Sequence, residues 1–153
     1  MTRSHRSVVV ATPIAHPREV VWAELAEIAH HVDWMRDATE IRFVGDQRRG
    51  VGTEFECDTK VGPIRLTDRM TITAWEDDRR MAVHHRGAVS GTGEFTLEDG
   101  PEATTVLHWR EQLAFPWWLA GRVGATIARP VLAALWRTNL KAFRAQIDRS
   151  ASG

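Results

Sequence analysis

Hydrophobic and polar residues follow two different periods along this chain. Near the N-terminus, the β-branched run Ser7–Ile14 predicts a strand. Apolar residues then recur at helical spacing over residues 17–29, which predicts a helix with Pro17 in its first turn. Residues 30–36 predict a second short helix or turn. The chain therefore opens with a strand and helices before the period changes to two.

Six segments with a period of two follow residue 38. Turns rich in glycine, proline or charged residues separate them. In each segment the apolar side chains fall on one face and the charged or polar side chains on the other, which is typical of an antiparallel meander with one covered face. The segments centre on residues 41–43, 53–60, 64–73, 81–87, 93–98 and 104–115.

The C-terminal segment, residues 116–150, repeats apolar residues every three or four positions and predicts a long helix. Pro130 lies inside it, and we expect this proline to kink or split the helix. A sheet with one apolar face needs a cover, and this helix is the obvious one. The order of elements predicts an α+β fold.

Composition narrows the class of protein. A chain of 153 residues suits one domain, and 43% hydrophobic residues argue against a disordered protein. The 20 basic and 20 acidic residues balance, which argues against a nucleic-acid partner. The single cysteine, Cys57, excludes an intramolecular disulfide and a cysteine-rich metal site. The N-terminal apolar run is too short for a signal peptide and no apolar stretch would span a membrane, so we expect a cytoplasmic location.

The turns between the segments predict the register of the strands. The resulting pairings are mutually in phase, whereas a slip by one residue would turn a whole strand over. The predicted pairs are Phe55 with Asp68, Cys57 with Leu66, Met70 with His85, Ile72 with Val83, Phe95 with Leu107, and Gly93 with Trp109.

Three ionisable side chains fall on the covered face in this register: Asp68, His85 and Glu111. One interpretation is a polar end to an apolar pocket, where His85 and a carboxylate orient or deprotonate a ligand hydroxyl or enol. The other is that both carboxylates lie near strand ends, reach water and pair with Arg86 or Arg110. The sequence leaves both interpretations open.

Other reactive groups give weaker signals. Cys57 is interpreted as a small core residue, because no positive group beside it lowers its pKa. His30, His31 and Asp33 lie close together, but no second cluster completes a metal site, and we expect a solvated helix end. We find no nucleophile motif, phosphate loop or dinucleotide fingerprint, and therefore expect no metal and no cofactor.

Five short motifs occur in order along the chain: Val20-Val21-Trp22, Asp33-Trp34-Met35, Gly50-Val51-Gly52-Thr53, Thr104-Thr105-Val106 and Asn139-Leu140-Lys141. Together they resemble the START-like (SRPBCC, helix-grip) superfamily, and in particular its polyketide cyclase/dehydrase and lipid-transport branch. The resemblance covers roughly residues 6–149 of a single domain spanning residues 1–153. It implies a seven-stranded curved antiparallel sheet wrapped around the long C-terminal helix, with two short helices after strand 1.

The resemblance implies a cavity between sheet and helix that holds a small apolar or aromatic ligand. Function varies within this fold, so a carrier or sensor without a chemical step is our leading hypothesis. The alternative is a cyclase or dehydratase that uses His85 with Asp68 or Glu111. The expected ligand-binding residues are Phe55, Cys57, Leu66, Met70, Val83, Phe95, Leu107, Trp109, Ile127, Val131 and Leu135.

A further hypothesis concerns the aromatic residues before the C-terminal helix. Phe115, Trp117 and Trp118 lie in sequence beside Arg122 and Arg129. Exposed aromatics here would mark an interface, with a membrane surface or with a second copy of the chain. The second alternative is therefore a docking module that acts through residues 115–118.

Overall fold

The structure of the chain is a computed structural model that describes residues 7–114 and 121–152, with side chains in the second range from residue 129 onward. Seven strands and three α-helices make up this described part. The predicted order of one strand, short helices, six strands and a long helix is confirmed. The elements are β1 Ser7–Ile14, α1 Arg18–Leu25, the 3₁₀ helix η1 Ile28–His30, α2 His31–Trp34, β2 Ala38–Val44, β3 Glu54–Val61, β4 Ile64–Glu76, β5 Arg80–Gly87, β6 Ser90–Asp99, β7 Thr105–Ala114 and α3 Gly121–Ala151.

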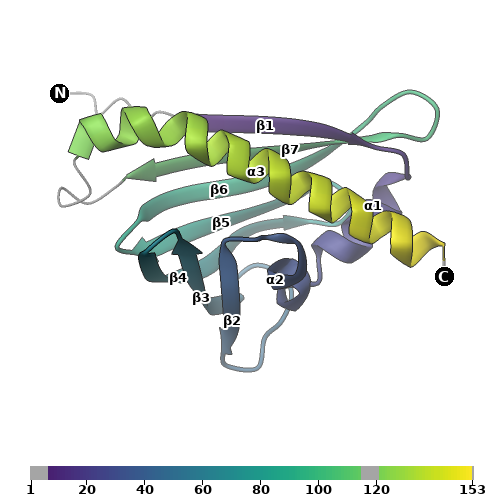
Figure 1. Cartoon of the computed structure of the whole chain (residues 1–153). Coiled ribbons are helices and arrows are strands. Elements are labelled where there is room, and N and C mark those ends of the chain that lie inside the picture. The colour runs from purple at the N-terminus through teal and green to yellow at the C-terminus, as the bar shows by residue number, and fades with distance from the viewer. Residues whose placement is uncertain (1–6, 115–120, 153) are drawn as a thin grey trace.

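The strands form one antiparallel sheet in the order β1-β7-β6-β5-β4-β3-β2. Strand β1 pairs with the last strand, so the N-terminal segment completes the sheet beside β7. Helix α3 runs diagonally across one face of the sheet, and α1 and α2 lie near its C-terminal half (Figure 1). This is the helix-grip arrangement, in which one apolar sheet face is covered by a long helix.

The inward face of α3 carries large side chains. Trp136, Leu140, Phe143 and Ile147 are buried against the sheet and the short helices. Asn139 is buried with them, and its amide oxygen accepts a hydrogen bond from the backbone N–H of Arg36 at 3.0 Å. This bond ties α3 to the segment between α2 and β2, where the buried amide is satisfied.

Pro130 does not split α3. The helix continues through it from Gly121 to Ala151, so of the two predicted effects, a kink or a split, the split does not occur. Pro130 lacks the N–H that would bond to the carbonyl of residue 126, and the helix continues without this hydrogen bond. Within the described residues, no helix is long and apolar enough to cross a membrane.

Aromatic rings fill the space between the sheet and the C-terminal half of α3. Trp34 lies at the centre, with its ring centroid 4.8 Å from Phe143 and 6.1 Å from Trp109. Trp109 in turn lies 5.0 Å from Phe95 and stacks on Trp136 at 5.2 Å. Tilted, edge-on and stacked pairs of this kind are the favourable geometries for aromatic rings. This cluster is the core of the molecule.

The predicted strand register is correct between β4 and β5, but it is two residues off between β3 and β4 and between β6 and β7. A two-residue slip keeps every side chain on its predicted face. At the first slip, Val61 pairs with Ile64, so the turn is the two residues Gly62-Pro63, centred one residue later than the predicted pairs require. The pairs Met70–His85 and Ile72–Val83 are confirmed, whereas Phe55 pairs with Met70, Cys57 with Asp68, Phe95 with Trp109 and Gly93 with Glu111.

Candidate functional site

The three ionisable residues of the predicted covered face are all buried. Asp68 on β4, His85 on β5 and Glu111 on β7 are 6%, 8% and 7% exposed. Arg86 and Arg110 are exposed, as neighbours on the opposite face of their strands must be. The interpretation in which the carboxylates reach water and pair with these arginines is therefore wrong. We refer to Asp68, His85 and Glu111 as the polar cluster.

Glu111 links two members of the covered face. Its Oε2 atom lies 3.2 Å from His85 Nε2, a contact between opposite charges that is not aligned as a hydrogen bond. Its Oε1 atom accepts a hydrogen bond of 2.9 Å from the indole N–H of Trp109. Trp109 therefore fixes the orientation of the carboxylate that faces His85, and the aromatic core connects directly to the polar cluster.

Asp68 lies at the other side of His85. Burial raises the pKa of its carboxyl, against the opposing effects of the His85 charge and the backbone N–H of Val89. Its Oδ1 atom has no hydrogen-bond partner among the described residues. A buried oxygen without a partner costs free energy, so this atom is suited to accept a hydrogen bond from a bound molecule.

His85 holds its proton more strongly than a free imidazole does. Burial alone lowers its pKa, but the contact with Glu111 and the charges of Glu111 and Asp68 outweigh burial and raise it. An imidazolium between two carboxyl groups can donate a proton, and either carboxylate can accept one. The arrangement therefore has the components of acid–base chemistry.

Two glycines create the space that the carboxyl groups occupy. Gly93 on β6 pairs with Glu111, and a Cβ atom at Gly93 would lie 2.7 Å from Glu111 Oε1. Gly87 pairs with Asp68, and a Cβ atom there would overlap Asp68 Oδ1. Any other residue at either position would displace a carboxyl group. Sequence reasoning missed this role and placed Gly93 opposite Trp109.

A third glycine on the same face lies opposite His85. Gly91 has a φ of 143°, and a Cβ atom there would overlap the backbone carbonyl of Gln112 on β7. Only glycine adopts this backbone readily. The spacing of Gly91 and Gly93, in phase with the apolar residue Phe95, was the available signal that this face needs glycines here.

Half-buried apolar side chains border the polar cluster. Met70 pairs with His85, Val83 with Gly93, and Leu113 with Gly91. All three are only partly buried, although they share the covered face with the fully buried core. The polar cluster therefore has an apolar border that is less tightly packed than the aromatic core.

The predicted ligand-binding residues divide into two groups. Those closest to the aromatic core are fully buried, and Leu66, Met70 and Val83 are half-buried. Whether they contact a ligand stays a prediction. The fully buried ones are Phe55, Cys57, Phe95, Leu107 and Trp109.

The three predicted ligand-binding residues on α3, Ile127, Val131 and Leu135, do not all face the sheet. Leu135 is half-buried, Val131 is 56% exposed, and the side chain of Ile127 lies outside the described residues. A step of four residues advances by about 40° more than one full helical turn, so a stripe with this spacing winds around the helix. Val131 therefore turns away from the sheet, while Trp136 and Leu140 remain inward.

Of the remaining candidates, Cys57 and His31 are buried, whereas His30 and Asp33 are exposed as expected. Burial raises the pKa of the Cys57 thiol to about 11, which leaves it protonated and a poor nucleophile. His31 is buried and not solvated as we expected, because its Nε2 atom bonds the carbonyl of Leu25 at 2.8 Å. Among the described residues, no group of three potential ligands would hold a metal ion.

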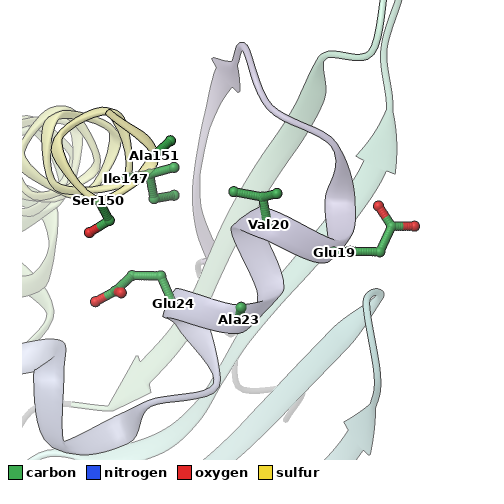
Figure 2. Close-up of a pocket in the computed structure, with 7 residues that line it drawn as sticks. All are labelled: Glu19, Val20, Ala23, Glu24, Ile147, Ser150 and Ala151. Atoms are coloured by element: carbon green, nitrogen blue, oxygen red, sulfur yellow. The ribbon is translucent and has the colours of Figure 1, made fainter. Parts of the chain in front are cut away.

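A surface groove lies elsewhere on the molecule, between α1 and the C-terminal end of α3 (Figure 2). Its volume is about 380 Å³. It holds no member of the polar cluster, and its acidic side chains are on the surface of α1. We therefore place the candidate site at the polar cluster. The groove is lined by Glu19, Val20, Ala23, Glu24, Ile147, Ser150 and Ala151.

The segment with Phe115, Trp117 and Trp118 lies outside the described residues. A homodimer or membrane contact through this segment, and a docking function based on it, stay predictions.

The sequence matches one family model, described as polyketide cyclase / dehydrase and lipid transport, over residues 5–148. No curated protein matches it significantly.

Solved structures show the same fold at low identity. The protein TTHA0849 from Thermus thermophilus is 14% identical with a TM-score of 0.77, over 97% of this chain and 100% of that chain. The ZhuI aromatase/cyclase from Streptomyces sp. R1128 is 19% identical with a TM-score of 0.73, over 95% of each chain. A START superfamily protein from Mycobacterium smegmatis is 9% identical with a TM-score of 0.73, over 94% of this chain and 97% of that chain. These similarities confirm the helix-grip fold.

Proposed function

The chain belongs to the polyketide cyclase / dehydrase and lipid transport family, and on this basis we propose that it binds a small hydrophobic or aromatic ligand between the sheet and α3, as a carrier or sensor. The apolar body of the ligand lies against the half-buried side chains Met70, Val83 and Leu113. Its polar end meets the polar cluster. One of the similar structures is an aromatase/cyclase, which is consistent with an aromatic ligand.

The observation that carries this proposal is the set of buried polar atoms without hydrogen-bond partners. Asp68 Oδ1, His85 Nε2 and Glu111 Oε2 all lack a partner among the described residues. They sit beside side chains that are apolar yet only half-buried. Ligand sites typically combine a mostly apolar wall with a few converging polar groups. A ligand that satisfies these atoms removes the cost of leaving them unpaired.

Two adjacent residues on β5 provide a matched test. Val83 lies on the covered face, and His84 points to the opposite face. Val83→Trp fills the space beside Gly93, whereas His84→Trp adds the same bulk outside. We expect Val83→Trp to weaken binding of the neutral dye Nile red at least tenfold in a fluorescence titration, with His84→Trp unchanged. Equal binding by both variants, each shown to be folded by circular dichroism, would contradict the proposal.

A dehydratase is the second candidate, because the fold brings together the three groups that such chemistry requires. In a β-hydroxyketone, Asp68 or Glu111 removes the proton on the carbon next to the carbonyl. The His85 imidazolium donates its proton to the departing hydroxyl, which leaves as water while a carbon–carbon double bond forms. Positioned acids and bases of this kind contribute about 10²–10⁴-fold each.

A model substrate separates the two candidates. Dehydration of 4-hydroxy-4-phenylbutan-2-one produces an enone that is followed by its ultraviolet absorbance. The dehydratase requires wild-type protein to accelerate this reaction and His85→Ala to abolish the acceleration, with His84→Ala as the control on the opposite face. Turnover that survives in His85→Ala would contradict the role of His85 as the acid, and no acceleration by wild-type protein would remove the enzymatic interpretation and leave the carrier.

A further inference from the structure

The ionisable groups on the covered face of the described strands are predominantly acidic. The buried ionisable side chains of this face are Asp68, Glu111 and His85, and none is a lysine or an arginine. The arginines of these strands instead form ion pairs on the outer face. Examples are Arg42 with Asp58 at 2.7 Å, Arg69 with Glu54 at 2.7 Å and Arg80 with Glu94 at 2.9 Å.

The free hydrogen-bonding capacity of the polar cluster is acceptor capacity. Asp68 Oδ1 and Glu111 Oε2 are carboxyl oxygens without partners among the residues that the structure describes, and an ionised carboxylate only accepts. Against these two acceptors the cluster has one donor, His85 Nε2, which also lacks a hydrogen-bond partner among the described residues and lies 3.2 Å from Glu111 Oε2. A molecule that enters must therefore bring donors of its own in order to satisfy these oxygens.

The two oxygens come from strands on either side of β5 and β6, with His85 between them on the covered face. Asp68 comes from β4 and Glu111 from β7, with Gly87 and Gly93 opposite them across the ladder. Because a side chain at either glycine would collide with the carboxyl group, the carboxyl groups lie close to the sheet. The half-buried side chains Met70, Val83 and Leu113 border them on the same face.

We propose that this site selects neutral ligands whose hydroxyl groups donate hydrogen bonds, and rejects ligands whose polar end is a carboxylate, such as a fatty-acid anion. The inference rests on the proposed function and specifies its ligand class. A hydroxyl satisfies a carboxylate oxygen, whereas a ligand carboxylate brings a further negative charge and only acceptors. A site rejects a wrong ligand strongly when that ligand leaves a buried polar group unpaired or places a like charge beside a charged side chain.

Three probes with one ring system test this selection. They are 2-naphthol, which is neutral at pH 7 and donates a hydrogen bond, naphthalene, which has no polar group, and 2-naphthoate, which is an anion. Equilibrium dialysis with ultraviolet detection gives the three dissociation constants. We expect 2-naphthol to bind wild-type protein at least tenfold more tightly than 2-naphthoate, with naphthalene between them.

Removal of the charges should invert the preference. In Asp68→Asn/Glu111→Gln, the amides supply donors, so we expect 2-naphthoate to gain at least tenfold and 2-naphthol to lose affinity. Glu98→Gln, at an exposed position on β6, is the control and should behave as wild type.

Each outcome bears on one claim. Binding of 2-naphthoate as tightly as 2-naphthol by wild-type protein overturns the selectivity and leaves the proposed function standing. Failure of all three probes to bind contradicts the proposed function and the selectivity with it. Since the wild-type comparison alone decides the selectivity, a variant that does not fold leaves the test intact.

Discussion

At the scale of single residues, the polar cluster depends on neighbours that carry no charge. The Trp109 indole holds one oxygen of Glu111, and Gly93 makes room for its carboxyl group. Without these neighbours, a buried carboxylate would require another partner or would be protonated. The chemistry of the site is therefore set as much by an aromatic ring and a missing side chain as by the ionisable groups.

Gly93→Ala tests the role of the missing side chain. Its methyl group would lie 2.7 Å from Glu111 Oε1, so the carboxylate must move. We expect the free energy of unfolding to fall by about 1–3 kcal/mol, the usual cost of overpacking, as measured by urea denaturation. In a Glu111→Ala background the same change should cost much less. An equal loss of unfolding free energy in both backgrounds would show that Gly93 is not required to make room for the Glu111 carboxyl group.

The buried His31 predicts a pH dependence. Burial lowers its pKa to about 4, below the value near 6.5 in the unfolded chain. The unfolded chain therefore takes up this proton first as the pH falls, so the contribution is complete above about pH 6.5 and is lost progressively toward pH 4. We expect His31→Gln to lose about 2 kcal/mol less stability than wild type between pH 7.5 and 5, measured by urea denaturation. An equal loss of stability by wild-type protein and His31→Gln over this pH range would show that His31 does not cause the pH dependence.

The sequence predicted the ionisable residues of the site but not the glycines. The period of two placed Asp68, His85 and Glu111 on the covered face, because alternation decides the face without any knowledge of pairing. Gly87 and Gly93 were missed because a glycine is neither apolar nor polar in such a pattern. Their role depends on which residue lies opposite, and that requires the register.

At the scale of elements, the length of each turn limited the prediction of register. The turn before β5 was placed correctly, whereas the Gly62-Pro63 turn and the turn after β6 were placed one residue off centre, which shifts each pairing by two. The faces remained correct because side chains alternate with a period of two. Consequently the composition of the covered face was predictable, and the partners across the strands were not.

Helix α3 yields a prediction of its own. Pro130 lies within an unbroken helix and removes one backbone hydrogen bond. We expect Pro130→Ala to raise the free energy of unfolding by about 1–3 kcal/mol in urea denaturation, since proline is the least favourable residue in a helix interior. Arg137→Ala, at another exposed position of α3, should have little effect. A destabilised Pro130→Ala would indicate that the proline fits a bend that the fold requires.

At the scale of the whole molecule, the sheet and α3 enclose two different regions. One is filled by the rings of Trp34, Trp109 and Trp136, which pack against each other and hold the fold together. The other contains the polar cluster with its half-buried border. Trp109 belongs to both, since it stacks on Trp136 and donates to Glu111. The polar cluster is thereby connected to the aromatic core.

The most direct test of a ligand site at the polar cluster is a two-dimensional ¹⁵N NMR titration of wild-type protein with 2-naphthol, because it reports where the probe binds. We predict that the largest amide shifts cluster at Asp68, His85, Gly93 and Glu111. Shifts concentrated in the groove around Val20 and Ser150, or no shifts at all, would contradict a ligand site between the sheet and α3.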